Sequence, residues 1–371
     1  MAAMNLRFLQ PGERIRVMIV DDSVVIRRLV AQALEYDPLI EVVGTASNGS
    51  IGLQRIPQLN PDVVTLDIEM PDMDGLEMLR CIRRDFPKLR VIMFSTLTER
   101  GGAKTLEALT LGADDYVAKV SNEGSLDRSM ARLRDEMIPK IRQFFRSPEK
   151  SRVEVRPGPR YTQEASSPSR SGSVSQVKKV KPKVVVIGVS TGGPTALGAI
   201  LPSLPASFPV PILVVQHMPP LFTRLLAERL NSTCPLRVEE AGHGATVEPG
   251  KILIAPGDFH MKVAASGGAV NVYLDQSPRQ NSCRPAADAL FTSTAEVYGG
   301  AVLAVVLTGM GQDGLRGTEI LKAQGATVFA QDEASSVVWG MPGAVVNAGL
   351  ADRVLTLDDV VPEILRQIGN N

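Results

Sequence analysis

The stretch RVMIVDDSVVIRRLVAQAL, residues 16–34, decides the fold of the first half of the chain. Arg16–Val20 is a short apolar and β-branched run, typical of a buried strand, and it ends at two aspartates and a serine. From Ser23, a suitable N-cap, apolar residues recur at helical spacing. A strand that leads through a polar turn into a helix predicts a parallel α/β sheet.

The same alternation continues further along the chain. Strands are predicted at Val63–Leu66, Val91–Phe94 and Asp115–Ala118, with helical stretches between them. These elements predict a doubly wound parallel sheet, in which ligands bind beyond the carboxyl ends of the strands. Polar residues follow the strands at that edge, and we expect them to converge on one site: Asp21, Asp22, Asp67, Ser95 and Lys119.

The chemistry of this set is specific. Three carboxylates in one place repel each other, and a hard divalent cation such as Mg²⁺ relieves the repulsion through oxygen ligation. One carboxylate can then act as a nucleophile toward a phosphoryl group, while a lysine and a hydroxyl hold the phosphate oxygens. Any one of these residues alone would be an ordinary polar strand end, but five in this order favour a phosphoryl-acceptor site.

Four motifs in this half resemble the receiver domain of response regulators, over about residues 15–135: VDDS (20–23), LDIEMPDMDG (66–75), FST (94–96) and YVAK (116–119). The resemblance implies that Asp67 is the phosphoacceptor, that Ser95 is the switch hydroxyl and that Lys119 contacts the phosphoryl group. It also implies that Mg²⁺ is bound by three side chains and one backbone carbonyl, those of Asp21, Asp22 and Asp67 and the carbonyl of Glu69. The family usually has a proline where this chain has Val120.

The charges are unevenly distributed, although 40 basic and 40 acidic residues give a formal net charge of zero. Residues 140–183 carry 12 basic and 3 acidic residues, whereas the segments before and after have net charges of −4 and −5. From Ser147 to Pro182 the chain is rich in Ser, Pro, Arg and Lys without periodicity, which predicts a largely disordered interdomain linker. A basic contact for an acidic partner or a nucleic acid is the alternative, but no DNA-binding motif supports a nucleic acid.

The second half opens with KVVVIGVSTGGPTAL, residues 183–197. Its apolar run predicts a buried strand, and Pro194 suits the first turn of a following helix. Gly188–Gly192 fits G-x-S-x-G, in which a serine sits on a tight turn beside backbone N–H groups that can face an oxyanion. A phosphate cradle is the alternative, although no Walker loop or G-x-G-x-x-G is present. Ser190 is therefore a candidate nucleophile that needs a base and a carboxylate.

The chain has only three histidines, which argues against a polyhistidine metal centre and limits the choice of base. His217 ends the apolar run Pro211–Gln216, so it is expected at the same edge of the sheet as Ser190. His243, between two glycines, and His260, after a loop, are weaker candidates. A buried structural role is the alternative for His217.

The orienting carboxylate should also follow a strand. Asp313 comes after Ala301–Leu307, the most apolar run of this half, through a glycine-rich turn. The order Ser–His–Asp differs from that of α/β-hydrolases, but triads are defined by geometry rather than by order. Three weaker rivals lie in loops or helices: Asp258, Asp288 and Asp332.

Several motifs resemble the catalytic domain of the chemotaxis protein-glutamate methylesterase (CheB) family, over about residues 183–370: GVSTGGP (188–194), QHMPP (216–220), RPAAD (284–288), LTGMGQDG (307–314) and ASSVVWGMP (334–342). The resemblance implies a catalytic triad of Ser190, His217 and Asp313. It places Thr191 and Met310 beside the triad, as backbone donors or as walls of the site. The family often has N-R-H-R-P where this chain has Asn281–Pro285, with serine and cysteine in the middle.

We therefore expect an α/β protein with two doubly wound parallel-sheet domains, a flavodoxin-like receiver and a Rossmann-like methylesterase domain, joined by a flexible linker. The receiver is expected at residues 15–139, the linker at 140–182 and the catalytic domain at 183–371. No secretory signal or membrane-spanning run is visible, and three cysteines cannot form a disulfide scaffold. We expect a cytoplasmic protein with no membrane insertion and no nucleic-acid partner.

The resemblance implies a phosphorylation-activated serine hydrolase that demethylates glutamate methyl esters on methyl-accepting chemotaxis receptors, and deamidates receptor glutamines, in sensory adaptation. A chemotaxis histidine kinase would be the phosphodonor, Mg²⁺ would bind in the receiver, and the esterase reaction would need no cofactor. The unphosphorylated receiver would cover the catalytic cleft. The alternatives are a receiver-controlled anion-binding module without hydrolysis and a receiver with a transcriptional output, for which no helix-turn-helix signature is present.

Overall fold

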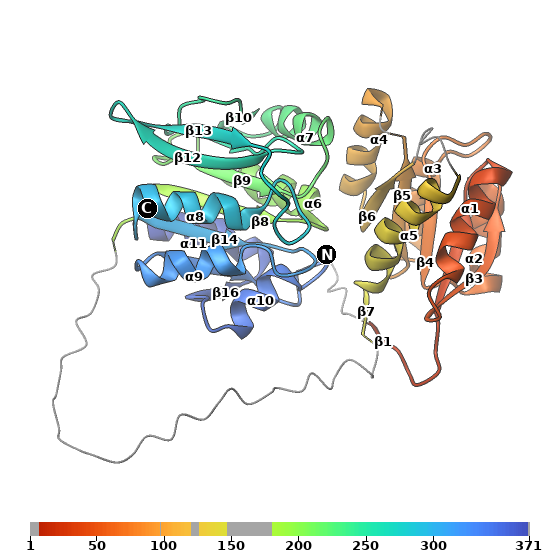
Figure 1. Cartoon of the computed structure of the whole chain (residues 1–371). Coiled ribbons are helices and arrows are strands. Elements are labelled where there is room, and N and C mark those ends of the chain that lie inside the picture. Colours follow the sequence, from red (N-terminus) through yellow and green to blue (C-terminus); the bar gives the residue numbers. More distant parts are fainter. Residues whose placement is uncertain (1–6, 97, 120–125, 147–179, 370–371) are drawn as a thin grey trace, which may run out of the picture.

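The computed structural model describes residues 7–96, 98–119, 126–146 and 180–369. These residues form two α/β parts, each built on its own parallel sheet, and Figure 1 shows the two parts side by side. The predicted fold class of two doubly wound parallel sheets is confirmed. Most of the predicted linker lies outside the described residues, as does Val120. Within the described ranges, no helix is both long and apolar enough to cross a membrane.

The first sheet has five parallel strands in the order β3-β2-β4-β5-β6. The sequence predicts all of them except β3, in which Glu41 is exposed and most other residues are half-buried, so that no continuous buried run marks it. The strands are β2 (Ile15–Val20), β3 (Ile40–Ala46), β4 (Val63–Asp67), β5 (Arg90–Ser95) and β6 (Asp115–Ala118).

Helices cover both faces of this sheet, because its strands alternate side chains toward two apolar cores. One face packs against α1 (Val24–Glu35), which Ser23 caps as predicted, and against α5 (Leu126–Arg142). The other packs against α2 (Gly49–Leu59), α3 (Gly75–Asp85) and α4 (Glu99–Thr110). Helix α5 runs through residue 139, and Phe144 after it is buried in the same core as α1.

A short parallel ladder lies at the end of this first part. Strand β1 (Arg7–Phe8) pairs with β7 (Phe145–Arg146), so the chain that enters the first part and the chain that leaves it are joined there. Arg146 also pairs with Glu333 of the second part through contacts of 3.2 Å.

The second sheet has seven parallel strands in the order β10-β11-β9-β8-β14-β15-β16. The order reverses between β8 and β14, and such a switch point is where open parallel sheets bind ligands. The strands are β8 (Val184–Val189), β9 (Ile212–Gln216), β10 (Arg237–Glu240), β11 (Lys251–Ile254), β14 (Val302–Val306), β15 (Thr327–Gln331) and β16 (Arg353–Leu355).

Two layers of helices enclose the second sheet, and an antiparallel hairpin lies beside it (Figure 1). One face packs against α6 (Gly193–Ile200), α7 (Phe222–Asn231) and α11 (Leu357–Ile368). The other packs against α8 (Ala287–Tyr298), α9 (Leu315–Ala323) and α10 (Met341–Asn347). The hairpin consists of β12 (His260–Ser266) and β13 (Ala269–Asp275).

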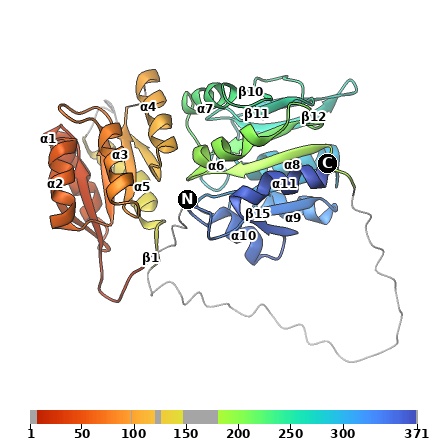
Figure 2. The same cartoon turned by 180° about the vertical axis from the view of Figure 1, so that it is seen from behind.

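The two parts meet through α4, which packs against α6 and α7; both Figure 1 and Figure 2 show this side of the first part facing the second. Buried side chains of α4 and of α6 and α7 belong to one continuous apolar cluster. The ring of Tyr116 stacks on that of Phe222, with centroids 4.9 Å apart. The interface therefore has an apolar centre rather than only surface ion pairs.

Candidate functional site

Ser190 lies on the tight strand-to-helix turn that the sequence predicts. Its backbone N–H donates to the carbonyl of Thr308 (3.0 Å), and its own carbonyl accepts from Gly193 (2.8 Å). Gly192 adopts a φ of +78° at the start of α6, a conformation that favours glycine. A Cβ at Gly309 would lie 2.7 Å from the Cβ of Ser190, so the next strand end can approach the serine only because residue 309 has no side chain.

His217 and Asp313 form a buried pair. His217 Nε2 donates to Asp313 Oδ2 over 2.7 Å, and the two side chains are 10% and 2% exposed. Burial disfavours the imidazolium and is the largest single effect, but the contacts with Asp313 and Cys283 together outweigh it and raise the pKa of His217 to about 10. Burial raises the pKa of the Asp313 carboxyl, but the bond to His217 and two backbone N–H groups outweigh it and lower that pKa overall.

The other candidate bases and carboxylates have hydrogen-bond partners away from Ser190. His260 Nε2 bonds the carbonyl of Pro278 (3.1 Å), and His243 Nδ1 accepts from Leu274 N (3.2 Å), so both histidines support loops around the hairpin. Asp258 pairs with Arg284, and Asp332 accepts from Ser335 N. Among these carboxylates, within the described ranges, only Asp313 bonds to His217.

Ser190 and His217 line the same small cavity, of about 30 Å³. His217 Nδ1 lies 3.5 Å from Cys283 Sγ, and no hydrogen bond joins Ser190 Oγ to His217 among the described residues. Four residues of the first part close this cavity: Leu109, Asp115, Tyr116 and Lys140. The structure thus brings the three predicted triad residues to one place while the first part of the chain covers the serine.

Thr191 makes a buried polar contact between the two parts. Its hydroxyl lies 2.9 Å from Asp115 Oδ2 and 3.1 Å from Gln143 Oε1, and the carboxylate is the stronger acceptor of its single proton. Asp115 is itself held by Lys140 Nζ at 2.7 Å. Met310 is 43% exposed after β14 and stays a predicted neighbour of the triad.

Sequence reasoning misses the residues that surround the Asp313 carboxylate. Backbone N–H groups of Ala287 and Asp288 donate to it over 2.6 and 3.1 Å, and Asn281 Nδ2 donates to Oδ1 over 3.0 Å. Gln216 Nε2 donates to the Ser190 carbonyl over 2.9 Å. The motifs around residues 281–288 are visible in the sequence, but their spacing does not indicate that they reach Asp313.

The five residues predicted at the edge of the first sheet also come together. The ligand atoms of Asp21, Asp22 and Asp67 lie within 4.8 Å of one another. Lys119 Nζ lies 2.7 Å from Asp67 Oδ2 and 3.0 Å from Asp21 Oδ2. Burial raises the pKa of Asp67 to about 6 against the opposing effect of Lys119. Ser95 Oγ is buried at the end of β5, where it accepts from Thr105 Oγ1 (2.7 Å).

This cluster fits a hard divalent cation. Asp21 Oδ2 is buried, and among the described residues it is balanced by the ion pair with the Lys119 ammonium and by no further hydrogen bond. A buried carboxylate oxygen of this kind, with two more carboxylates in reach, matches the oxygen ligands that Mg²⁺ prefers. The side chain of Glu69 pairs with Lys104 instead, so only its backbone carbonyl remains for the predicted role.

Comparison with known proteins agrees with both halves of this description. Residues 185–364 match the family model described as CheB methylesterase, and residues 17–131 match the response regulator receiver domain. Two relatives are named protein-glutamate methylesterase/protein-glutamine glutaminase. The one from Trichodesmium erythraeum (strain IMS101) is 49% identical over 360 residues, which cover 96% of this chain and 99% of the relative. The one from Nocardioides sp. (strain ATCC BAA-499 / JS614) is 51% identical over 363 residues, which cover 96% of each chain.

Among solved structures, the Thermotoga maritima CheB methylesterase catalytic domain is 49% identical and matches 50% of this chain and 99% of that domain, with a TM-score of 0.49. The family assignment rests on the full-length relatives, whose identity extends over both parts of the chain. The chain therefore belongs to the CheB methylesterase family, whose members hydrolyse carboxylic esters, and it carries a receiver domain ahead of its methylesterase domain.

Proposed function

We propose that this chain is a phosphorylation-activated protein-glutamate methylesterase that demethylates glutamate methyl esters of chemotaxis receptors and deamidates receptor glutamines. The observation that carries the proposal is the small cavity shared by Ser190 and His217, with His217 bonded to Asp313 and receiver residues lining the cavity as well. Its methyl-accepting receptors and a chemotaxis histidine kinase would be its partners in the cytoplasm.

The hydrolysis uses the side chains that the structure brings together. Because Nε2 of His217 is bonded to Asp313, Nδ1 is the nitrogen that can take the Ser190 proton. The serine oxygen then bonds the ester carbonyl carbon, and backbone N–H groups near Thr191 stabilise the oxyanion. His217 returns the proton to the leaving oxygen, which departs as methanol; an amide would depart as ammonia. Water, deprotonated by His217, then cleaves the acyl-serine and leaves a glutamate.

The receiver restrains this reaction by occupying the approach to Ser190. The Asp115 carboxylate accepts a hydrogen bond from the Thr191 hydroxyl in the cavity that Ser190 lines. A receptor side chain would have to enter this cavity to reach the serine. Tyr116, the next residue, stacks on Phe222 of the catalytic domain. Phosphorylation of Asp67 would shift the population toward an arrangement in which these contacts are broken.

The residues of the phosphoryl-acceptor site would have different roles. Asp21, Asp22, Asp67 and the carbonyl of Glu69 would hold Mg²⁺, which neutralises the charge between the acceptor carboxylate and the phosphoryl group when it is bound. Lys119 holds the Asp67 carboxylate in place and is within reach of a phosphoryl oxygen on it. Ser95 supplies the hydroxyl that would follow the phosphoryl group and so connect the site to α4.

The test is methanol release from methylated receptor by the full-length protein, with and without a small phosphodonor. Ser190→Ala should reduce the rate by roughly 10⁴-fold or more, because the acyl intermediate cannot form. Asp67→Asn should retain the basal rate but lose the response to the phosphodonor. A Ser190→Ala protein that releases methanol at the wild-type rate would overturn the assignment.

A further inference from the structure

A two-residue turn between the hairpin and α8 reaches into the catalytic pair. Gln280 and Cys283 are paired by backbone hydrogen bonds of 3.1 and 2.8 Å. Between them, Asn281 and Ser282 have φ values of +49° and +65°. Two consecutive residues in the left-handed region define a tight turn in which asparagine is among the best tolerated residues. The conformation of the turn therefore fixes where the Asn281 side chain points.

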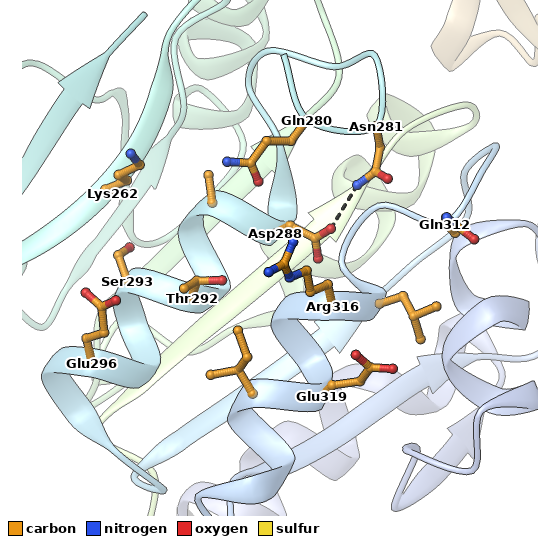
Figure 3. Close-up of a pocket in the computed structure, with 13 residues that line it drawn as sticks. Lys262, Gln280, Asn281, Asp288, Thr292, Ser293, Glu296, Gln312, Arg316 and Glu319 are labelled. Atoms are coloured by element: carbon orange, nitrogen blue, oxygen red, sulfur yellow. Dashed lines mark hydrogen bonds between the residues drawn. The ribbon is translucent and has the colours of Figure 1, made fainter. Parts of the chain in front are cut away.

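The Asn281 side chain joins two carboxylates. Its Nδ2 donates to Asp288 Oδ2 over 2.8 Å, the contact drawn in Figure 3, and to Asp313 Oδ1 over 3.0 Å. A carboxamide nitrogen has two hydrogens, so it can serve both acceptors at once. Asp288 and Asp313 are 6% and 1% exposed, and these buried carboxylates would otherwise face each other without a donor between them.

Two helices, α8 and α9, hold Asp288 in place. Its Oδ1 accepts from Gly317 N over 2.7 Å at α9, and the residue itself lies in the first turn of α8. Asp288 is thus anchored to two helices, and Asn281 transmits that anchorage to Asp313. The same turn also places Cys283 Sγ 3.5 Å from His217 Nδ1, so it contacts both members of the His217–Asp313 pair.

We infer that Asn281 is a positioning residue of the esterase reaction: by joining Asp313 to Asp288, it holds the Asp313 carboxylate in the orientation that directs His217 toward Ser190. The inference rests on the proposed function for its kinetic consequence, although the geometry stands without it. Asn281 itself does not touch the substrate in this role. Asn281 also lines a second cavity, of about 810 Å³, together with Gln280, Gln312 and Arg316 (Figure 3).

The kinetic test compares Asn281→Ala and Asn281→Asp with Gln280→Ala in the full-length protein treated with phosphodonor. Gln280 is a matched control, because it belongs to the same turn and cavity while its side chain makes no hydrogen bond among the described residues. A lost bond to a charged group predicts a fall in kcat of about 10–100-fold with little change in KM for Asn281→Ala. Asn281→Asp keeps the size of the side chain but adds a third carboxylate, so its kcat should fall further. The double variant Asn281→Asp with Asp288→Asn should recover part of the lost kcat.

A spectroscopic readout separates positioning from general damage. The chain has only three histidines, so the ring N–H signal of His217, bonded to Asp313, can be assigned by NMR with His243 and His260 as internal references. Asn281→Ala should displace or broaden that signal and leave the other two unchanged, whereas Gln280→Ala should leave all three. An unchanged kcat together with an unchanged His217 signal would overturn the inference. If the wild-type protein released no methanol but Asn281→Ala still displaced the signal, the proposed function would fail and the positioning role would stand.

Discussion

At the scale of single residues, His217 has unlike neighbours on its two nitrogens. Nε2 contacts the Asp313 carboxylate, whereas Nδ1 contacts the thiol of Cys283. Before Ser190 can be deprotonated, Nδ1 has to exchange the thiol for the serine hydroxyl. In the arrangement of this structure, receiver residues line the cavity beside Ser190 and the base contacts a thiol instead of the serine.

The pH dependence of the reaction should reveal the Asp313 bond. Only the neutral imidazole can accept a proton, and the contacts with Asp313 and Cys283 together raise the pKa of His217 to about 10 despite its burial. Since the neutral form gains as pH rises toward that value, kcat/KM should increase steadily from neutral into alkaline pH. In Asp313→Asn the rise of kcat/KM with pH should occur at lower pH, and the maximum rate should fall. A wild-type profile already flat above about pH 7 would contradict the raised pKa.

The Asn281 contacts show why the sequence predicts the triad but not the residues that surround it. Ser190, His217 and Asp313 are recognisable because each follows a buried apolar strand, and strand ends of one parallel sheet meet at one edge. Asn281 and Cys283 follow no strand of that sheet. They reach the site because the hairpin and α8 fold over its edge, and that approach depends on long-range packing that no local pattern encodes.

At the scale of elements, the continuous apolar runs make the central strands predictable. The runs that mark β2, β4, β5, β8 and β14 are entirely or almost entirely buried in the structure. The strands β3, β12 and β13 lack that signal, since most of their residues are half-buried or exposed. Helix α4 shows a further limit: its glycines suggest a weak helix, but one of them serves the contact between domains.

Helix α4 should be sensitive to bulk at that contact. A Cβ at Gly102 would lie 2.7 Å from Leu225 Cδ1 of α7. Gly102→Leu should therefore push the domains apart, because overpacking of this kind costs about 1–3 kcal/mol. We expect methanol release without phosphodonor to rise about tenfold or more. Ala103→Leu is the matched control, because residue 103 is exposed on the same helix. An unchanged basal rate in Gly102→Leu would argue that separating the two domains does not activate the esterase.

At the scale of the whole molecule, specific contacts hold the receiver against the catalytic domain, and under the proposed function these contacts would inhibit the esterase. An aromatic stack, a buried carboxylate on Thr191 and an exposed ion pair between Arg224 and Glu99 occupy one interface. The exposed pair contributes little, because solvent screens it. The apolar and buried polar contacts next to Ser190 would therefore contribute most to the proposed inhibition.

Removing residues 1–179 should accordingly raise the basal esterase rate to that of the phosphorylated full-length protein and abolish any response to phosphodonor. The cut lies beyond residue 139 because α5 continues to Arg142 and Phe144 belongs to the receiver core. Circular dichroism would verify that the remaining domain is folded. A truncated, folded protein with the unphosphorylated rate would mean that the receiver does not cover the site in solution.

The stack of Tyr116 on Phe222 has a further consequence, because both rings belong to one polypeptide. Closure is a unimolecular event with an effective concentration set by the connecting chain, so it does not depend on how many copies a cell contains. Under the proposed regulation, a contact too weak to hold two separate proteins together would be sufficient for inhibition. A single phosphoryl group would be able to overcome such a contact, and the response of the enzyme to its signal would not depend on its own abundance.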